Sequence, residues 1–305
     1  MTKWAPYVCM QTNSKCYKGT TKFKPVGILW HSTGANNTSL KRYVQPTDGS
    51  ANYDADIAKL GKNINRNDWN HKQESAGVNA FIGKFADGIV GTVQCMPWDY
   101  APWGCGNGFK GSCNKIRQSD GTYIGWIQFE ICEDNLNDKD YAQKVYDEAV
   151  ALTAYLCKEY KIKPDGVVTV KGVSIPTITC HNDASKLGFA TSHSDINHWF
   201  PNILNKDMDA VRRDVGVALG EAPAALQGEL HELPQTTENS TEELTTYEVK
   251  ITANALNVRK GPGTNYKINK VVHKNEIFTI IDEQGGWGQL KSGDGWIMLK
   301  YTSKV

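Results

Sequence analysis

The chain has 305 residues, with 34 Lys and Arg against 33 Asp and Glu and a formal net charge of +1. This length exceeds one compact domain of ordinary size, so we expect a main domain and a smaller module. The balanced charge gives no long-range field toward nucleic acid or an anionic membrane, and we expect neither as a partner.

The N-terminal segment MTKWAPYVCM lacks the basic stretch and the run of about 7–15 apolar residues that form a secretory signal. No run approaches the roughly 18 apolar residues of a membrane-spanning helix. The sequence therefore predicts no signal peptide and no membrane insertion. We expect a protein that is made in the cytoplasm and reaches any outside target by another route.

Residues 1–217 mix apolar strands with one strongly periodic helix. The helix is predicted over residues 137–160, where apolar side chains recur at helical spacing and Asn137 or Asp138 can cap the first turn. The predicted strands include GILWHST, DGIVGTVQCM and GWIQFEIC, and VVTVKGVSIPTITCH is predicted as a hairpin leading into a further strand. Interleaved strands and helices predict an α/β fold, with a mixed central β-sheet flanked by helices.

The composition changes after residue 217. Residues 218–246 are predicted as a flexible acidic linker, because the stretch from Gly220 to Thr245 carries six acidic residues and no Lys or Arg. Residues 247–305 show short strands broken by KGPGTN, DEQGG and KSGDG, which predicts a small all-β barrel.

Eight cysteines are scattered without Cys-x-x-Cys spacing, so a four-cysteine zinc ribbon is not expected. Cys105 and Cys113 share the glycine-rich loop GCGNGFKGSC, and whether they form a short disulfide stays open. We expect the cysteines to be mostly reduced and buried. They are Cys9, Cys16, Cys95, Cys105, Cys113, Cys132, Cys157 and Cys180.

Histidines gather at the predicted strand ends and in one loop. His31 ends a strand in LWHSTG, His181 follows another in TITCHND, and SHSDINHWF contains His193 and His198. A catalytic zinc usually takes three protein ligands and leaves a place for water, and His31, His181 and Asp195 would form such a set. Each histidine taken alone fits a structural role better than a metal-binding one.

Four motifs occur in a consistent order between about Gly27 and Val215: GILWHSTG, NAFIGKFADGIVGTVQ, IQFEIC and CHND followed by SHSD. In this order the segment resembles the zinc-dependent N-acetylmuramoyl-L-alanine amidases, whose fold is shared with peptidoglycan recognition proteins and phage lysins. The resemblance implies Zn²⁺ at His31, His181 and Asp195. The closing loop departs from the family pattern, so His198 competes with Asp195 as third ligand.

The resemblance also implies roles beside the metal. Glu130 matches the glutamate that acts as general base, although a structural ion pair is the alternative. His193 stands where many members have a lysine that stabilises the oxyanion. Trp103 and Asn79 are the expected substrate contacts, and Gly104 replaces the second residue of a Trp-His pair found in many members.

The C-terminal module resembles bacterial SH3-type domains of cell-wall enzymes through LNVRKGPGTNY and GGWGQLKSGDGWIMLKY. The resemblance implies wall binding by Asn257, Arg259, Tyr266 and Trp287.

Together these features predict a peptidoglycan hydrolase, either a phage endolysin or an autolysin, that cleaves the amide bond between N-acetylmuramic acid and L-alanine with zinc-activated water. The alternative is a recognition protein of the same fold that binds peptidoglycan without cutting it. A glycosidase would need a second carboxylate near Glu130, and the sequence shows no obvious one.

Overall fold

The computed structural model describes residues 4–19, 21–73, 75–220, 247–259, 261, 267–284 and 286–304. The chain divides into two compact units, Met1–Leu230 and His231–Val305. The predicted acidic linker, beyond Gly220, lies outside the described residues. Within the described ranges, no helix combines the length and the apolar character needed to cross a membrane.

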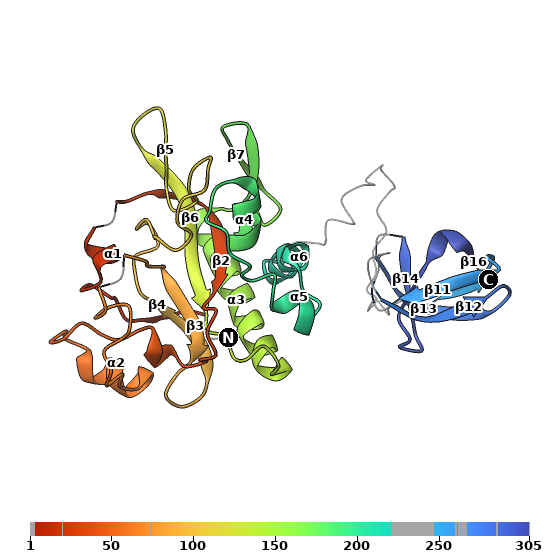
Figure 1. Cartoon of the computed structure of the whole chain (residues 1–305), viewed down its shortest axis with the longest axis horizontal. Helices are drawn as coiled ribbons and strands as arrows, with labels where there is room; N and C mark the ends of the chain where they lie inside the picture. Colours follow the sequence, from red (N-terminus) through yellow and green to blue (C-terminus); the bar gives the residue numbers. More distant parts are fainter. Residues whose placement is uncertain are drawn as a thin grey trace, which may run out of the picture. The chain divides into compact units, whose positions relative to one another are not determined.

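The first unit is built on a mixed sheet, which confirms the predicted fold class. Parallel pairs join β1 to β4, β3 to β6, β6 to β2 and β2 to β9, whereas β3 with β4 and β5 with β6 are antiparallel. Figure 1 shows β2 and β6 side by side at the centre. In sheet order the strands are β1 (Tyr7–Val8), β4 (Val90–Gln94), β3 (Ala80–Lys84), β6 (Tyr123–Ile131), β2 (Lys24–Ser32) and β9 (Ile178–Cys180), with β5 (Ile116–Arg117) added to β6.

One face of this sheet packs against α3 (Lys139–Tyr160) and α6 (Met208–Ala218). The predicted cap is confirmed, because the Asp138 side chain accepts a hydrogen bond from the backbone N–H of Tyr141. Trp30 and Phe129 of the sheet share a buried cluster with Val145 of the long helix. Burying each large apolar side chain stabilises the folded state by about 1.5–3 kcal/mol. This packing therefore fixes the positions of β2 and β6.

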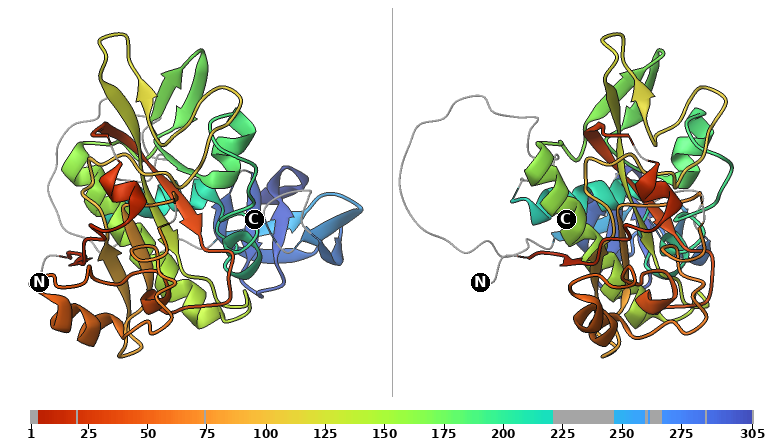
Figure 2. Two further views of the ribbon diagram at one scale, coloured as in Figure 1. Left: turned by 60° about the vertical axis from the view of Figure 1, so that its left-hand side comes forward. Right: turned by 90° about the vertical axis from the view of Figure 1, so that its left-hand side faces the viewer.

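The opposite face carries shorter elements. Near β3 it is covered by η1 (Leu40–Arg42) and α2 (Tyr53–Leu60), and near β2 by α4 (His181–Leu187). The predicted hairpin is present as β7 (Val167–Val170) and β8 (Val173–Pro176), and it projects from the same end of the unit as β5 (Figure 2). The remaining helices are α1 (Lys15–Lys18) and α5 (Phe200–Ile203).

The alternation of side chains along β2 and β6 decides where the polar residues lie. Ile28 and Trp30 join the cluster beneath α3, so Leu29 and His31 point to the other face. In β6, Phe129 likewise faces the helices, which places Gln128 and Glu130 opposite. Because His31 pairs with Glu130 in the parallel register, the two side chains are neighbours on one face.

The second unit is a seven-stranded, wholly antiparallel sheet, which confirms the all-β prediction. Its core is aliphatic and includes Val249, Val258, Ile280 and Ile297. Its elements are β10 (Tyr247–Ile251), β11 (Ala255–Arg259), β12 (Ile268–His273), β13 (Ile277–Gln284), β14 (Trp287–Leu290), β15 (Trp296–Met298), η3 (Leu299–Tyr301) and β16 (Thr302–Lys304).

All eight cysteines are buried and free, as expected for reduced thiols, and Cys105 and Cys113 are not joined. Burial raises the pKa of the Cys105 thiol to about 11, so this side chain stays protonated at neutral pH.

Asn79 corrects an expectation from the sequence, because its side chain is fully buried and does not face a substrate. Its amide nitrogen donates to the carbonyl oxygens of Pro97 (2.9 Å) and Tyr100 (3.0 Å), and its amide oxygen accepts from the backbone N–H of Gln128 (3.0 Å). The side chain therefore fastens the loop after β4 to the middle of β6.

We expect Asn79→Ala to lower the free energy of unfolding of the first unit by about 1–3 kcal/mol, because it leaves buried backbone groups without partners. Urea unfolding followed by tryptophan fluorescence would measure this loss. The exposed Asn65, changed to Ala, is the matched control and should have little effect. A variant of unchanged stability with a raised KM would instead restore Asn79 as a substrate contact.

Candidate metal centre and catalytic site

Three side chains from distant parts of the sequence meet at one end of the sheet. His31 comes from the end of β2, His181 begins α4, and Asp195 lies in the loop that follows. One ligand atom from each lies within 4.8 Å of the others. The Nδ1 atoms of His31 and His181 are 3.0 Å apart, and Asp195 Oδ2 is 3.2 Å from the first and 3.5 Å from the second.

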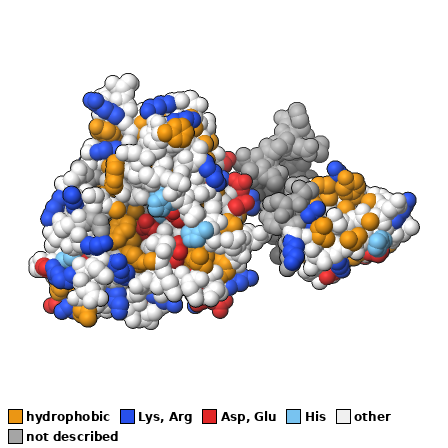
Figure 3. Space-filling model, in the orientation of Figure 1, with side chains coloured by type: hydrophobic (Ala, Val, Ile, Leu, Met, Phe, Trp, Pro, Cys, Tyr) orange, Lys and Arg blue, Asp and Glu red, His pale blue; other side chains and the backbone are white. Residues whose placement is uncertain are grey.

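These residues line a hollow of about 390 Å³. Figure 3 shows histidine and acidic side chains gathered in a depression on the first unit, with a hydrophobic patch beside them. The triad itself is buried, whereas His193 at the rim is exposed. The exposed His193 therefore lies where the hollow meets solvent.

A chain of hydrogen bonds determines which ring nitrogen of His31 carries the proton. Asn114 donates from Nδ2 to the Gly106 carbonyl (3.0 Å), so its Oδ1 is an acceptor and receives Gln128 Nε2 at 3.0 Å. The amide oxygen of Gln128 then faces His31 Nε2 at 2.9 Å. His31 must therefore carry its proton on Nε2, which leaves a lone pair on Nδ1.

Thr191 determines in the same way which ring nitrogen of His181 carries the proton. The Thr191 hydroxyl donates to the Cys105 carbonyl oxygen (3.2 Å) and lies 3.2 Å from His181 Nε2. Because its proton is already used, the hydroxyl accepts from His181 Nε2–H. His181 Nδ1 is then also unprotonated.

These tautomers test whether the triad fits a metal. In the neutral rings, the two Nδ1 lone pairs lie 3.0 Å apart and face a carboxylate oxygen, so they repel one another unless a proton or a metal cation lies between them. A His, His, carboxylate set is the donor chemistry of a catalytic zinc site with one open position. The outer hydrogen bonds are of the kind that orient metal-binding histidines. The residues present fit Zn²⁺.

Asp195, and not His198, completes the triad. Asp195 Oδ2 faces both Nδ1 atoms, at 3.2 Å from that of His31 and 3.5 Å from that of His181. His198 lines the same hollow but lies 3.0 Å from Glu133 Oε1, and this hydrogen bond raises the pKa of His198. The structure thus places the competing ligand in a separate ion pair.

Glu130 lies beside the triad with an unused oxygen. Its Oε2 is buried and has no hydrogen-bond partner among the described residues. Burial, followed by the charges of Asp195 and Glu133, raises the pKa of Glu130 well above its ordinary value. A carboxylate held this way, and lining the hollow, has the properties of an acid or base rather than of an ion-pair partner.

His193 is placed over the triad but is not part of it. Its ring stacks on that of His181 at a centroid distance of 4.4 Å and an interplanar angle of 15°. Its Nδ1 is 3.6 Å from Asp195 Oδ1, and its side chain is 60% exposed. It can therefore contact a substrate at the rim.

Trp103 and Gly104 border the site. Trp103 is 39% exposed, which leaves its indole open to a ligand. A Cβ at Gly104 would lie 2.5 Å from Gln128 Oε1 and 3.2 Å from His31 Nε2. A larger residue there would displace the side chain that orients His31, which explains why glycine replaces the second residue of the family's pair.

The expected wall-binding residues of the second unit come together in part. Asn257, Arg259 and Trp287 line one hollow of about 460 Å³. Lys300 and Tyr301 complete it, although the sequence did not single them out. Trp287 is largely buried. Tyr266 lies outside the described residues.

The residues behind the triad were missed from the sequence. Gln128 had a usable signal, since it precedes Glu130 by two in a strand that is otherwise apolar, which puts both on one face. Asn114 and Thr191 lie in loops, where no periodicity indicates their partners.

Comparison with known proteins now gives the family. Residues 21–199 match the family model described as N-acetylmuramoyl-L-alanine amidase, and residues 254–303 match the bacterial SH3 domain. A Bacillus subtilis (strain 168) protein, YrvJ, whose name gives it provisionally as an N-acetylmuramoyl-L-alanine amidase, is 39% identical over 60 residues. That match spans 19% of this chain and only 12% of the relative.

Among solved structures, the Staphylococcus aureus hydrolase AmiA in complex with its ligand is 18% identical at a TM-score of 0.40, covering 73% of this chain and 84% of that one. The catalytic domain of PlyG is 14% identical at a TM-score of 0.41, with coverage of 72% and 99%. Since the first family model spans more than half of the sequence, the chain belongs to the N-acetylmuramoyl-L-alanine amidase family and carries a C-terminal bacterial SH3 domain.

Proposed function

We propose that this protein hydrolyses the amide bond between N-acetylmuramic acid and the L-alanine of the peptidoglycan stem peptide, using Zn²⁺ held by His31, His181 and Asp195. The observation that carries the proposal is the meeting of His31 Nδ1, His181 Nδ1 and an Asp195 oxygen in one hollow. Membership of the amidase family supports the choice of bond.

A zinc ion with three protein ligands polarises a bound carbonyl group and brings the pKa of a bound water toward 7. Glu130 acts as the proton acceptor, because its free Oε2 has no competing partner. Burial and the charges of Asp195 and Glu133 raise the pKa of Glu130, which makes its carboxylate a stronger proton acceptor. The same carboxyl can then give the proton to the leaving amine.

His193 stabilises the negative charge that develops on the scissile carbonyl oxygen. Its ring lines the hollow, and its Nδ1 lies 3.6 Å from Asp195 Oδ1. Positioned donors of this kind typically contribute about 10²–10³-fold in rate.

The SH3 domain binds the cell wall and keeps the enzyme near its substrate. Its hollow presents Arg259 and Lys300 beside Tyr301, a combination suited to anionic peptide. Tethering two binding modules can raise avidity by about 10²–10⁴-fold without new contacts. We place the protein on the wall after release from the cytoplasm, as an endolysin or an autolysin.

A recognition protein without catalysis is the alternative of the same fold. A binder would tolerate loss of a metal ligand or of the proton acceptor. Here the full His, His, Asp set lies in one hollow with Glu130. That completeness favours hydrolysis.

Purified cell walls treated with the full chain should release new L-alanine amino groups and no new reducing sugar ends. Removal of the metal with a chelator should abolish release, and added Zn²⁺ should restore it. Dansylation of the released N-termini, with a reducing-sugar assay in parallel, measures both products. Wall binding without new amino groups would support the non-catalytic alternative, and reducing ends would indicate a glycosidase.

Glu130→Gln keeps the shape of the side chain but removes its ability to accept a proton. We expect it to bind zinc as tightly as the natural chain and to lose at least about 10²-fold in kcat. The exposed Glu159 of α3, changed to Gln, is the control for the altered charge. Full activity of Glu130→Gln would remove this residue from the mechanism.

Gln128→Met removes the acceptor behind His31 at nearly constant volume. Loss of such an outer partner typically costs about 10–100-fold in metal affinity, and we expect a loss in this range in a competitive zinc titration. Gln143, exposed on α3, serves as control when changed to Met. Unchanged zinc affinity in a destabilised Gln128→Met protein would show that Gln128 serves packing alone.

A further inference from the structure

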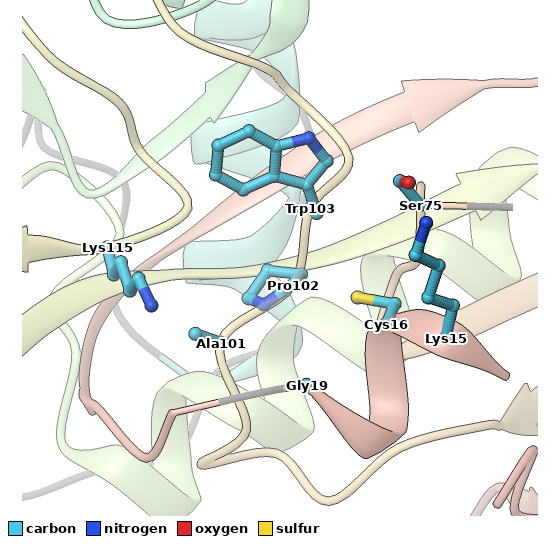
Figure 4. A pocket seen from close by; sticks show the side chains of 8 residues that line it. All are labelled: Lys15, Cys16, Gly19, Ser75, Ala101, Pro102, Trp103 and Lys115. Atoms are coloured by element: carbon cyan, nitrogen blue, oxygen red, sulfur yellow. The ribbon is translucent and has the colours of Figure 1, made fainter.

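A second hollow of about 260 Å³ lies next to the catalytic one, and we call it the Trp103 hollow. Its lining includes an aromatic ring and two lysines (Figure 4). Lys115 lies on one side of the segment 101–103, and Lys15 lies on the other (Figure 4). Its lining includes Lys15, Cys16, Pro102, Trp103 and Lys115.

The charge of the Trp103 hollow is not neutralised within the part of the chain that the structure describes. No Asp or Glu there forms an ion pair with Lys15 or Lys115. Lys115 is held in place, since its Nζ donates to Thr21 Oγ1 at 2.9 Å and lies 5.4 Å from the ring centroid of Tyr123. Lys15 is exposed on α1. Two ammonium groups beside an indole select an anionic ligand with an apolar surface.

The hollow lies within peptide reach of the triad. A Cβ at Gly104 would be 3.2 Å from His31 Nε2. Trp103 is the preceding residue, and neighbouring Cα atoms are about 3.8 Å apart, so its Cα lies within roughly 9 Å of that imidazole nitrogen. An extended peptide advances about 3.3–3.6 Å per residue. The hollow therefore begins two to three residues from a bond held at the triad.

Part of the hollow is contributed by residues outside the family match. Lys15 and Cys16 belong to α1, whereas the amidase family model begins at residue 21. The Ser14 side chain caps this short helix by accepting from the backbone N–H of Tyr17. The N-terminal segment thus adds one wall and one of the two lysines to the substrate side of the site.

We propose that the Trp103 hollow binds the second residue of the stem peptide, with its free carboxylate between Lys15 and Lys115 and its aliphatic part against Trp103. This inference rests on the proposed amidase function. The N-acetylated sugar units carry no charge for the lysines to select. The acidic second residue, on the L-alanine side of the cleaved bond, does carry one.

The test compares two soluble muramoyl tripeptides that differ only at the second residue, D-glutamate in one and its amide, D-isoglutamine, in the other. We expect the natural chain to show about a fivefold lower KM for the D-glutamate form, with similar kcat, since two partly exposed charge pairs supply about 1 kcal/mol. The preference should shrink as the salt concentration rises from about 0.05 to about 0.3 M, because salt screens the charges.

Three variants locate the preference. Lys15→Met alone should reduce the preference by about half, and Lys15→Met with Lys115→Met should abolish it. Lys18→Met removes the same charge from the same helix, but Lys18 lies outside the hollow and bonds to Asn13. The preference should survive in Lys18→Met. Equal KM values in the natural chain, or equal loss in Lys18→Met, would overturn the proposal.

Binding separates this inference from the proposed function. Calorimetric titration of both peptides into the Glu130→Gln protein needs no turnover, so a preference for the D-glutamate peptide there supports the inference even if the natural chain cuts nothing. Cleavage of both peptides with no preference for the D-glutamate form would support the amidase function and contradict the inference. Inhibition by poly(glycerol phosphate) through Lys15 and Lys115, with no peptide preference, would assign the hollow to an anionic wall polymer instead.

Discussion

The structure depends on one electrostatic constraint: two imidazole lone pairs and a carboxylate oxygen point at a common centre. In the neutral rings of His31 and His181, the proton stays on Nε2 because Gln128 and Thr191 accept it there, so the repulsion between the Nδ1 atoms remains. A divalent cation bound between these atoms removes the repulsion, and the fixed orientation of the two rings strengthens its binding. The buried Asp195 supplies the compensating negative charge.

The packing of helices on the sheet positions the side chains of the site. The long helix α3 packs on one face of the sheet and fixes the alternation of β2 and β6, so that His31, Gln128 and Glu130 emerge together on the other. Asn79 joins the backbone of β6 to the loop that precedes Trp103. The same buried framework therefore sets the metal ligands, the proton acceptor and the adjoining Trp103 hollow.

Much of this could be predicted from the sequence, for identifiable reasons. Strand and helix periodicity located β2, β6, α3 and the β7–β8 hairpin, and the order of the motifs indicated His31, His181 and Asp195 as one set. The errors and omissions share a physical cause. The burial of Asn79 and the roles of Asn114, Thr191 and Lys15 depend on contacts between distant loops, which leave no local pattern in the chain.

The central claim is that a single zinc ion joins these segments, and X-ray absorption at the zinc edge of the purified full chain tests it most directly. The account predicts one zinc per chain, with two nitrogen ligands at about 2.0–2.1 Å and a carboxylate oxygen at about 2.0–2.2 Å, and no sulfur. A folded chain that degrades walls at full rate without stoichiometric transition metal would contradict it, as would a sulfur ligand to the bound zinc.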